Sequence, residues 1–156
     1  MYKHHDKTGE HISLHDCKAE KVKFKNGYLT FYFKDGFWIF PSSEFNGTDK
    51  TLRTDAAKVR FHLQFEDIYD FSFYVFSRSK KRRFICTEPK IKKFIKKINK
   101  GKYSVEFLYM YSTKSNDLKI AECVLWGKKP RSERLYIKID ADSTEYCWNG
   151  LTEREW

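Results

Sequence analysis

The chain has 156 residues, of which 18% are aromatic and 33% are charged, and its formal net charge is +10. This length suits one domain over residues 1–156, which can fold without disulfides or a structural metal. No run approaches the ~18 apolar residues of a membrane span, and the N-terminus has no apolar signal core, so we expect a cytoplasmic protein with four free cysteines.

Positive charge is concentrated in one segment. Residues 78–102 contain 12 Lys or Arg and a single acid, Glu88, a balance of +11, whereas the rest of the chain carries 19 basic and 20 acidic residues, a balance of −1. A nearly neutral body with one strongly positive segment indicates an anionic partner, such as nucleic acid, an acidic protein or an anionic membrane. The alternative is that the lysines only keep the surface solvated.

The N-terminal segment is polar and contains possible metal ligands. Residues 1–11 are expected to be flexible, and a short strand is predicted at 12–17. We expect no cofactor and no bound metal; if a metal binds, the candidate ligands are His11, His15 and Cys17. Residues two apart on a strand share a face, so His15 and Cys17 are also the candidate pair for nucleophilic catalysis. The alternative is a polar tail followed by a turn.

Two turn sequences predict a three-stranded meander. Asn26-Gly27 supplies the two positive-φ residues of a type I′ turn, and Asp35-Gly36 has the same form. The predicted cross-strand pairs are Phe24–Leu29, Val22–Phe31, Phe33–Trp38 and Phe31–Phe40.

The second face of this meander is too apolar to be purely solvated. It carries Tyr28, Tyr32 and Phe37 beside Lys21 and Lys23. Such a surface needs a cover, which would be an amphipathic helix, a second sheet or a partner. We expect the helix, because its own apolar stripe must be buried somewhere.

The remaining chain alternates further strands with one helix. Residues 42–55 show no periodicity and predict a loop, a lid or a short helix. Strands are predicted at 57–65, 69–76, 83–86, 103–111, 118–126 and 135–139, with a final short strand at 144–148 that folds back on its predecessor.

One amphipathic helix is predicted at about 88–100. Its apolar stripe consists of Ile91, Phe94, Ile95 and Ile98, and lysines cover the opposite side. Thr87 is the expected N-cap, and Gly101 is expected to end the helix in the left-handed conformation. The elements together predict a mostly β (α+β) fold, an antiparallel barrel-like or sandwich-like sheet of about 8–10 strands with this one helix.

Two stretches of the sequence carry a resemblance. LHDCKAEKVKFKNGYLTFYFKDGFW, at 14–38, and YCWN, at 146–149, resemble the ends of small uncharacterised bacterial β-rich domains. The resemblance implies a β-rich fold and carries no catalytic residue to this chain.

No nucleotide-binding or hydrolase motif is present, which argues against nucleotide-dependent enzymes and the common hydrolases. We therefore expect a non-enzymatic cytoplasmic binding module that engages an acidic protein or nucleic acid. The predicted anion-binding residues are Lys92, Lys93, Lys96, Lys97, Lys100, Arg82 and Arg83. One alternative is a metal-dependent protein or enzyme that uses His15 and Cys17. Another is a protein-interaction domain that binds through the aromatic face of the meander.

Overall fold

The structure is a computed structural model that describes residues 2–78, 84–113, 115, 117–127 and 132–156. These residues form thirteen strands, one 3-10 turn and one α-helix. The strands are β1 His4–Asp6, β2 Ile12–Ser13, β3 Cys17–Lys25, β4 Tyr28–Phe33, β5 Trp38–Ile39, β6 Leu52–Thr54, β7 Ala57–Leu63, β8 Phe71–Arg78, β9 Phe84–Thr87, β10 Tyr103–Ser112, β11 Leu118–Gly127, β12 Ser132–Trp148 and β13 Leu151–Glu155. The 3-10 turn η1 is Ile68–Asp70 and the helix α1 is Ile91–Asn99. No helix of the described residues is long and apolar enough to cross a membrane.

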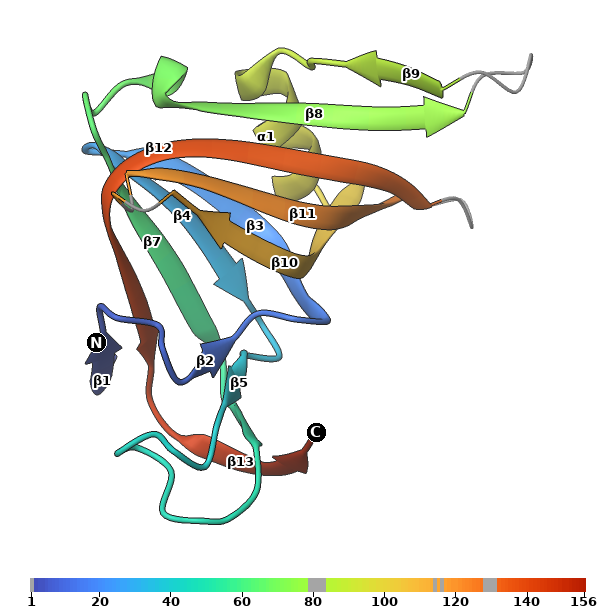
Figure 1. The fold of residues 1–156 in the computed structure, drawn as a ribbon. Helices are drawn as coiled ribbons and strands as arrows, with labels where there is room; N and C mark the ends of the chain where they lie inside the picture. The colour runs from blue at the N-terminus through green and yellow to red at the C-terminus, as the bar shows by residue number, and fades with distance from the viewer. Residues whose placement is uncertain (1, 79–83, 114, 116, 128–131) are drawn as a thin grey trace.

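Six antiparallel strands close a barrel in the order β11-β10-β3-β4-β7-β12, because β12 also pairs with β11 (Figure 1). β8 and β1 pair with β12, and β9 pairs with β8, which gives a nine-stranded main sheet within the described residues. The predicted mostly β, barrel-like fold with one helix is confirmed. A four-stranded sheet, β13-β6-β5-β2, lies below the barrel in Figure 1 and takes up part of the predicted loop 42–55. Residues 4–6, within the segment expected to be flexible, pair as β1 with β12.

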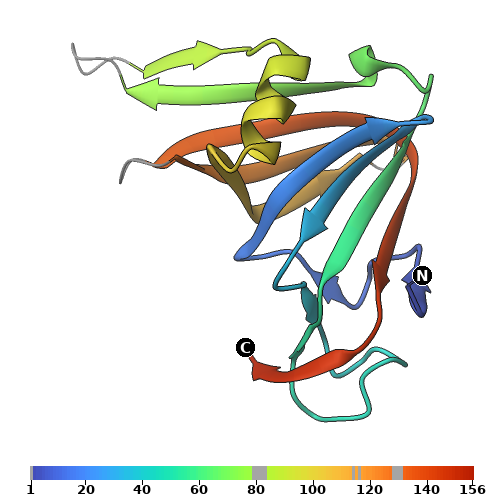
Figure 2. The same ribbon diagram turned by 180° about the vertical axis from the view of Figure 1, so that it is seen from behind.

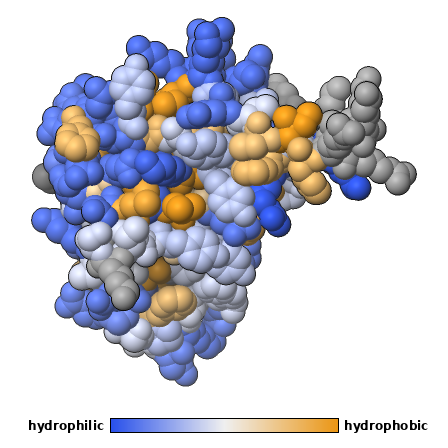
Figure 3. Space-filling model, turned by 45° about the horizontal axis from the view of Figure 1, so that its top comes forward, coloured by the Kyte–Doolittle hydropathy of each residue, from blue (hydrophilic) through white to orange (hydrophobic). Residues whose placement is uncertain are grey.

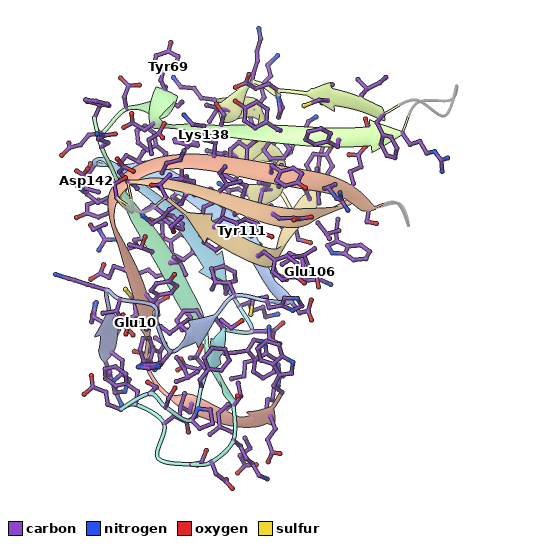
Figure 4. All side chains as sticks on the ribbon, viewed as in Figure 1. Glu10, Tyr69, Glu106, Tyr111, Lys138 and Asp142 are labelled. Atoms are coloured by element: carbon purple, nitrogen blue, oxygen red, sulfur yellow. The ribbon has the colours of Figure 1, made fainter. Side chains whose placement is uncertain are left out.

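β12 is a long bent strand that belongs to both sides of the barrel. Its first part pairs with β11 and β8, and its last part pairs with β7. The register with β7 shifts between Ala141 and Ser143, and Figure 4 shows Asp142 where the strand turns. An extra residue in one strand bends it and increases its twist. The prediction that 144–148 folds back as a separate strand is therefore wrong, since the irregularity turns one continuous strand around the corner.

The first predicted hairpin is confirmed, with Phe24 opposite Leu29. The second turn differs from the prediction. It is closed one residue earlier, by the Gly36 N–H donating to the Phe33 carbonyl at 3.3 Å, and Gly36 but not Asp35 has a positive φ, so the chain leaves the barrel. β4 pairs with β7 on its other edge, and β5 pairs with β2 and β6. The predicted pairing of Phe33 with Trp38 is wrong, because β7 takes the second edge of β4 and Trp38 pairs with Ser13 and Arg53 in the smaller sheet.

The helix α1 fills a wedge between β3 and β8. β7 and β8 pair with successive parts of the same edge of β12, so the two strands diverge after Leu63. Figure 2 shows α1 between the β8–β9 hairpin and β3. The Phe94 ring lies 4.8 Å from that of Phe73 on β8, and Ile98 is fully buried. The expectation that α1 covers Tyr28 and Tyr32 is therefore wrong.

The start of α1 differs from the prediction, and its end agrees with the prediction. The helix begins at Ile91 after Lys90, whose side chain makes no cap, because Thr87 pairs with Val75 as the last residue of β9. At the other end the Gly101 N–H donates to Ile98 (2.8 Å) and the Lys102 N–H to Lys97 (2.9 Å), with Gly101 at φ +64°. These bonds form the Schellman arrangement, so the predicted C-terminal end is confirmed.

The β8–β9 hairpin projects from the barrel (Figure 1). Hydrophobic side chains gather toward its projecting end on the side of the molecule seen in Figure 3, where Phe84 is 78% exposed. The barrel interior, in contrast, is closely packed with aromatic rings, with Phe31 in edge contact with Phe61 and Phe107. The stability of the fold therefore resides in the barrel and α1 rather than in the hairpin tip.

Candidate anion-binding surfaces

Five exposed lysines form one side of α1, here called the lysine face: Lys92, Lys93, Lys96, Lys97 and Lys100. Within the described chain, none of them forms an ion pair with a carboxylate. Lys97 lies over the Tyr103 ring, 5.5 Å from its centroid, which still leaves the ammonium group on the surface. The lysine face therefore presents uncompensated positive charge to solvent. Arg82 and Arg83, the other predicted anion-binding residues, lie outside the described residues.

Packing and hydrogen bonds hold in place the helix that carries the lysine face. Burial of Phe94 and Ile98 stabilises the helix by about 1.5–3 kcal/mol per side chain, which a nine-residue helix needs because it would not persist alone. The Asn99 side chain adds two 2.8 Å hydrogen bonds with Val22, accepting from its N–H and donating to its carbonyl oxygen. Fixed cations lose less freedom when they bind an anion than cations on a mobile segment.

The predicted metal ligands are not brought together. The Cys17 thiol is buried and donates to the His15 carbonyl oxygen at 3.4 Å, and burial raises its pKa to about 12. The His15 ring instead stacks on Trp156, and its Nδ1 lies 3.0 Å from an Asp16 oxygen without hydrogen-bond alignment. His11 Nδ1 pairs with the Ser42 hydroxyl at 2.9 Å. The strand alternation that we expected fails because Asp16 has φ +58° and turns the chain before β3.

A different group of ligand-type atoms does meet, and sequence spacing did not indicate it. His5 of β1 and Glu145 and Cys147 of β12 place their ligand atoms within 4.8 Å of one another, because His5 is opposite Cys147 in the sheet. Arg60 forms an ion pair with the Glu145 carboxylate, with Nη1 2.8 Å from Oε2. Burial also raises the pKa of Cys147 to about 11, so the thiol stays protonated at neutral pH.

These contacts hold the N-terminal strand on the barrel. His5 Nδ1 lies 2.9 Å from Glu145 Oε1 and 3.5 Å from Cys147 Sγ. Burial raises the pKa of the Glu145 carboxyl, but the hydrogen bond with His5 and the charge of Arg60 outweigh it and hold the pKa below its usual value. A metal ion would have to displace Arg60 and deprotonate a buried thiol, so the donor set suits a polar tether better than a metal site.

A second basic surface lies on the outside of β3, β4 and β7, and we call it the outer sheet face. The strand registers align its nine residues in three rows, Lys25–Tyr28–His62, Lys23–Thr30–Arg60 and Lys21–Tyr32–Lys58. Most of these residues line a shallow depression of about 380 Å³. Phe37, which we had predicted to belong to this surface, is fully buried against Tyr146 and Trp148. The outer sheet face is thus a mixture of cations and tyrosines rather than an apolar patch.

The sequence contained the signals for this surface but not the connection between them. Each strand alternates clearly, with Lys21, Lys23 and Lys25 on one and Lys58 and Arg60 on another. The cations meet only because β7 pairs with β4, a contact between segments about thirty residues apart. The overall charge balance also concealed them, since acidic residues elsewhere offset these lysines in the sum.

Comparisons of the chain with protein-family models, with curated proteins and with solved structures gave no match. The two basic surfaces therefore have to be interpreted from their own geometry and chemistry.

Proposed function

We propose that this protein is a non-enzymatic cytoplasmic binding module that engages an anionic partner, nucleic acid or an acidic protein surface, through the lysine face of α1. The observation that carries the proposal is the exposure of Lys92, Lys93, Lys96, Lys97 and Lys100, with no ion pair to a described carboxylate. Lysine is a flexible point charge without the bidentate fork of arginine, so this surface suits phosphate or carboxylate groups rather than base edges.

Membrane attachment agrees less well with the packing of the helix. An interfacial helix inserts its apolar face into the lipid. Here Phe94 and Ile98 fill the wedge between β3 and β8, where they are 3% and 0% exposed. Insertion would require α1 to leave the barrel and break both hydrogen bonds between Asn99 and Val22. A soluble polyanion reaches the lysines without any such change.

The test is binding of two fluorescent polyanions, a DNA duplex and polyglutamate, over a range of salt concentrations. If five lysines each neutralise one phosphate, the logarithm of the DNA affinity falls with the logarithm of salt concentration at a slope of about −4.5. The double variant Lys93→Glu, Lys97→Glu should weaken binding of the probe and reduce the steepness of the slope by about 1.8.

The matched control is Lys7→Glu, Lys34→Glu, which lowers the net charge from +10 to +6 as well but replaces two exposed lysines off the helix. The proposal requires this control to keep most of the affinity that the helix variant loses. Equal losses in the two variants, or no binding of either polyanion at low salt, would contradict it. Binding of polyglutamate but not of DNA would assign the surface to an acidic protein.

A further inference from the structure

We infer that the outer sheet face is a binding track for single-stranded nucleic acid, in which lysines of β3 contact phosphates and the tyrosines of β4 stack on unpaired bases. The inference depends on the proposed function for the anionic nature of the partner. It deepens that function by adding a second surface and by naming the chemical class of the ligand.

The charge of the surface favours a polyanion. Its nine residues include five cations and no carboxylate. Lys21, Lys23, Lys25 and Lys58 make no ion pair within the described chain. The nearby carboxylates are confined to two margins: Glu145 pairs with Arg60 and His5 toward β12, and Glu66 and Asp142 lie within 3.7 Å of His62 at one end. Lys21, Lys23 and Lys25 are therefore available for phosphates, while Lys58 lies against the Tyr2 ring, 4.8 Å from its centroid.

The spacing of the cations suits an extended chain rather than a compact anion. Alternate residues of a strand are about 6.8 Å apart, and neighbouring strands are separated by about 4.8 Å. Lys21, Lys23 and Lys25 therefore form a line along β3, with Lys58 two strands away in the row of Lys21. Three cations in a line along one strand match the repeated phosphates of an extended chain, which can use them in turn.

The planar groups between the cations favour unpaired bases. Tyr32 lies between Lys21 and Lys23, whose ammonium groups are 5.5 and 5.8 Å from its ring centroid. The Arg60 guanidinium lies over the Tyr28 ring, 4.0 Å from its centroid, so Arg60 and Tyr28 form a second planar surface as a stacked pair. Aromatic rings and guanidinium planes stack on exposed bases of single strands, whereas the base faces of a duplex are already covered by their neighbours.

The surface is also free of the cover that we had expected. α1 packs in the wedge between β3 and β8, at the edge of β3 rather than over this face. Tyr28 and Tyr32 consequently remain half-buried, the Tyr32 ring beside Lys21 and Lys23 and the Tyr28 ring beside Arg60 and His62. Lys21 and Lys23 flank Val22, to which Asn99 of the helix is hydrogen-bonded. A strand bound along β3 can therefore continue onto the adjacent lysine face.

The experiment compares labelled oligothymidylate with a duplex of the same length, using the full chain and fluorescence anisotropy. We expect tighter binding of the single strand. Tyr32→Ala should weaken single-strand binding about 5- to 150-fold, the usual range for one stacking ring, and should leave duplex binding unchanged. Tyr32→Phe keeps the ring and should keep the affinity, which separates the loss of stacking from a loss of folding.

Two further variants complete the design. Lys23→Glu, Lys25→Glu should reduce the steepness of the salt dependence for the single strand by about 1.4, since each phosphate contact contributes about 0.7. Tyr111→Ala removes an exposed ring of β10, which is 53% exposed, and should have no effect. Together these results would support the inference, because the surface would be distinguished by both its charge and its rings.

Other outcomes separate this inference from the proposed function. If the single strand and the duplex bind equally and only Lys93→Glu, Lys97→Glu weakens them, the outer sheet face is not a track, while the lysine face retains its role. If neither nucleic acid binds but polyglutamate does, the ligand class is wrong and the anionic partner is a protein. If no polyanion binds, the inference and the proposed function both fail.

Discussion

The side-chain amide of Asn99, at the end of α1, replaces a neighbouring strand for Val22 of β3. Its oxygen accepts from the Val22 N–H and its nitrogen donates to the Val22 carbonyl oxygen, both at 2.8 Å. The contact lies where β3 has lost β10 as a partner, since their pairing ends at Ala19. One side chain therefore satisfies a strand edge and attaches the helix that carries the lysine face.

Removal of this amide should loosen α1. Asn99→Ala leaves two backbone groups of Val22 without a protein partner, and two hydrogen bonds of this kind contribute about 1–3 kcal/mol together. The better helix propensity of alanine offsets up to about 0.7 kcal/mol of this loss. We expect a lower free energy of unfolding in urea and faster amide exchange in residues 91–99. Lys96→Ala, on the exposed side of the same helix, should change neither measurement.

Gly36 should tolerate substitution less well than Gly101 or Gly47. It has φ +73°, and a Cβ there would lie 2.3 Å from the Thr54 carbonyl oxygen and 2.4 Å from that of Asp55. Strain and collision with a backbone that cannot retreat should cost about 3–5 kcal/mol in Gly36→Ala, or prevent folding.

Two glycine controls separate strain from collision. Gly101 also has a positive φ, of +64°, but open space around it, so Gly101→Ala should cost only about 1–2 kcal/mol. Gly47 has neither constraint, and Gly47→Ala should stay within about 0.5 kcal/mol of the parent protein. Chemical denaturation ranks the three variants, and a Gly36 variant as stable as the Gly47 variant would contradict the close approach to Thr54.

Acid should weaken the tether of the N-terminal strand. The folded-state pKa of Glu145 lies below its ordinary value of 4.5, so the unfolded chain binds a proton more readily than the folded protein does. The contribution of this carboxylate to stability is therefore complete above the unfolded pKa and is lost as pH falls through the folded pKa.

Glu145→Gln removes the titrating group and provides the measurement. Urea unfolding at a series of pH values should show the parent protein more stable than the variant near neutral pH, with the two curves converging as the medium is acidified. A stability difference that stays constant down to about pH 3 would show that Glu145 contributes through packing rather than through its charge.

One of the four cysteine thiols should react much faster than the other three in the native protein. Cys86 on β9 is exposed, whereas Cys17, Cys123 and Cys147 are buried. Burial raises the pKa of Cys17 to about 12 and that of Cys147 to about 11, which leaves little of the reactive thiolate at neutral pH. A thiol reagent should modify one cysteine of the native protein and four after denaturation, and Cys86→Ser should abolish the native reaction. Rapid native labelling of Cys147 would instead show that β1 detaches readily.

Local patterns in the sequence predicted what depends on neighbouring residues. Asn26-Gly27 predicted both the turn and the register of β3 with β4, because a two-residue turn leaves no choice of pairing. The strict alternation of the segment 57–65 predicted β7, and the glycine after the lysine helix predicted its end. The sequence also predicted the apolar face and the lysine face of α1, since spacing along a helix decides which residues share a side.

Contacts between distant segments decided the rest. The predicted reversal at Asp35-Gly36 did not form, because the turn closes one residue earlier and β4 takes as its second neighbour β7, about thirty residues away in sequence. The bend in β12 likewise depends on pairing with β7 and β8 at once, and the first residue of α1 depends on how far β9 follows β8.

The candidate surfaces divide in the same way. The sequence alone determined the lysine face, because residues 91–100 contain both its five lysines and the apolar residues whose burial turns those lysines outward. Only the tertiary structure assembled the outer sheet face and brought His5 to Glu145, because strand pairing joins residues whose distance along the chain carries no information about their distance in space. Where α1 packs decided which of these surfaces stayed open, and the wedge that receives its apolar side exists only once β7 and β8 have paired with β12.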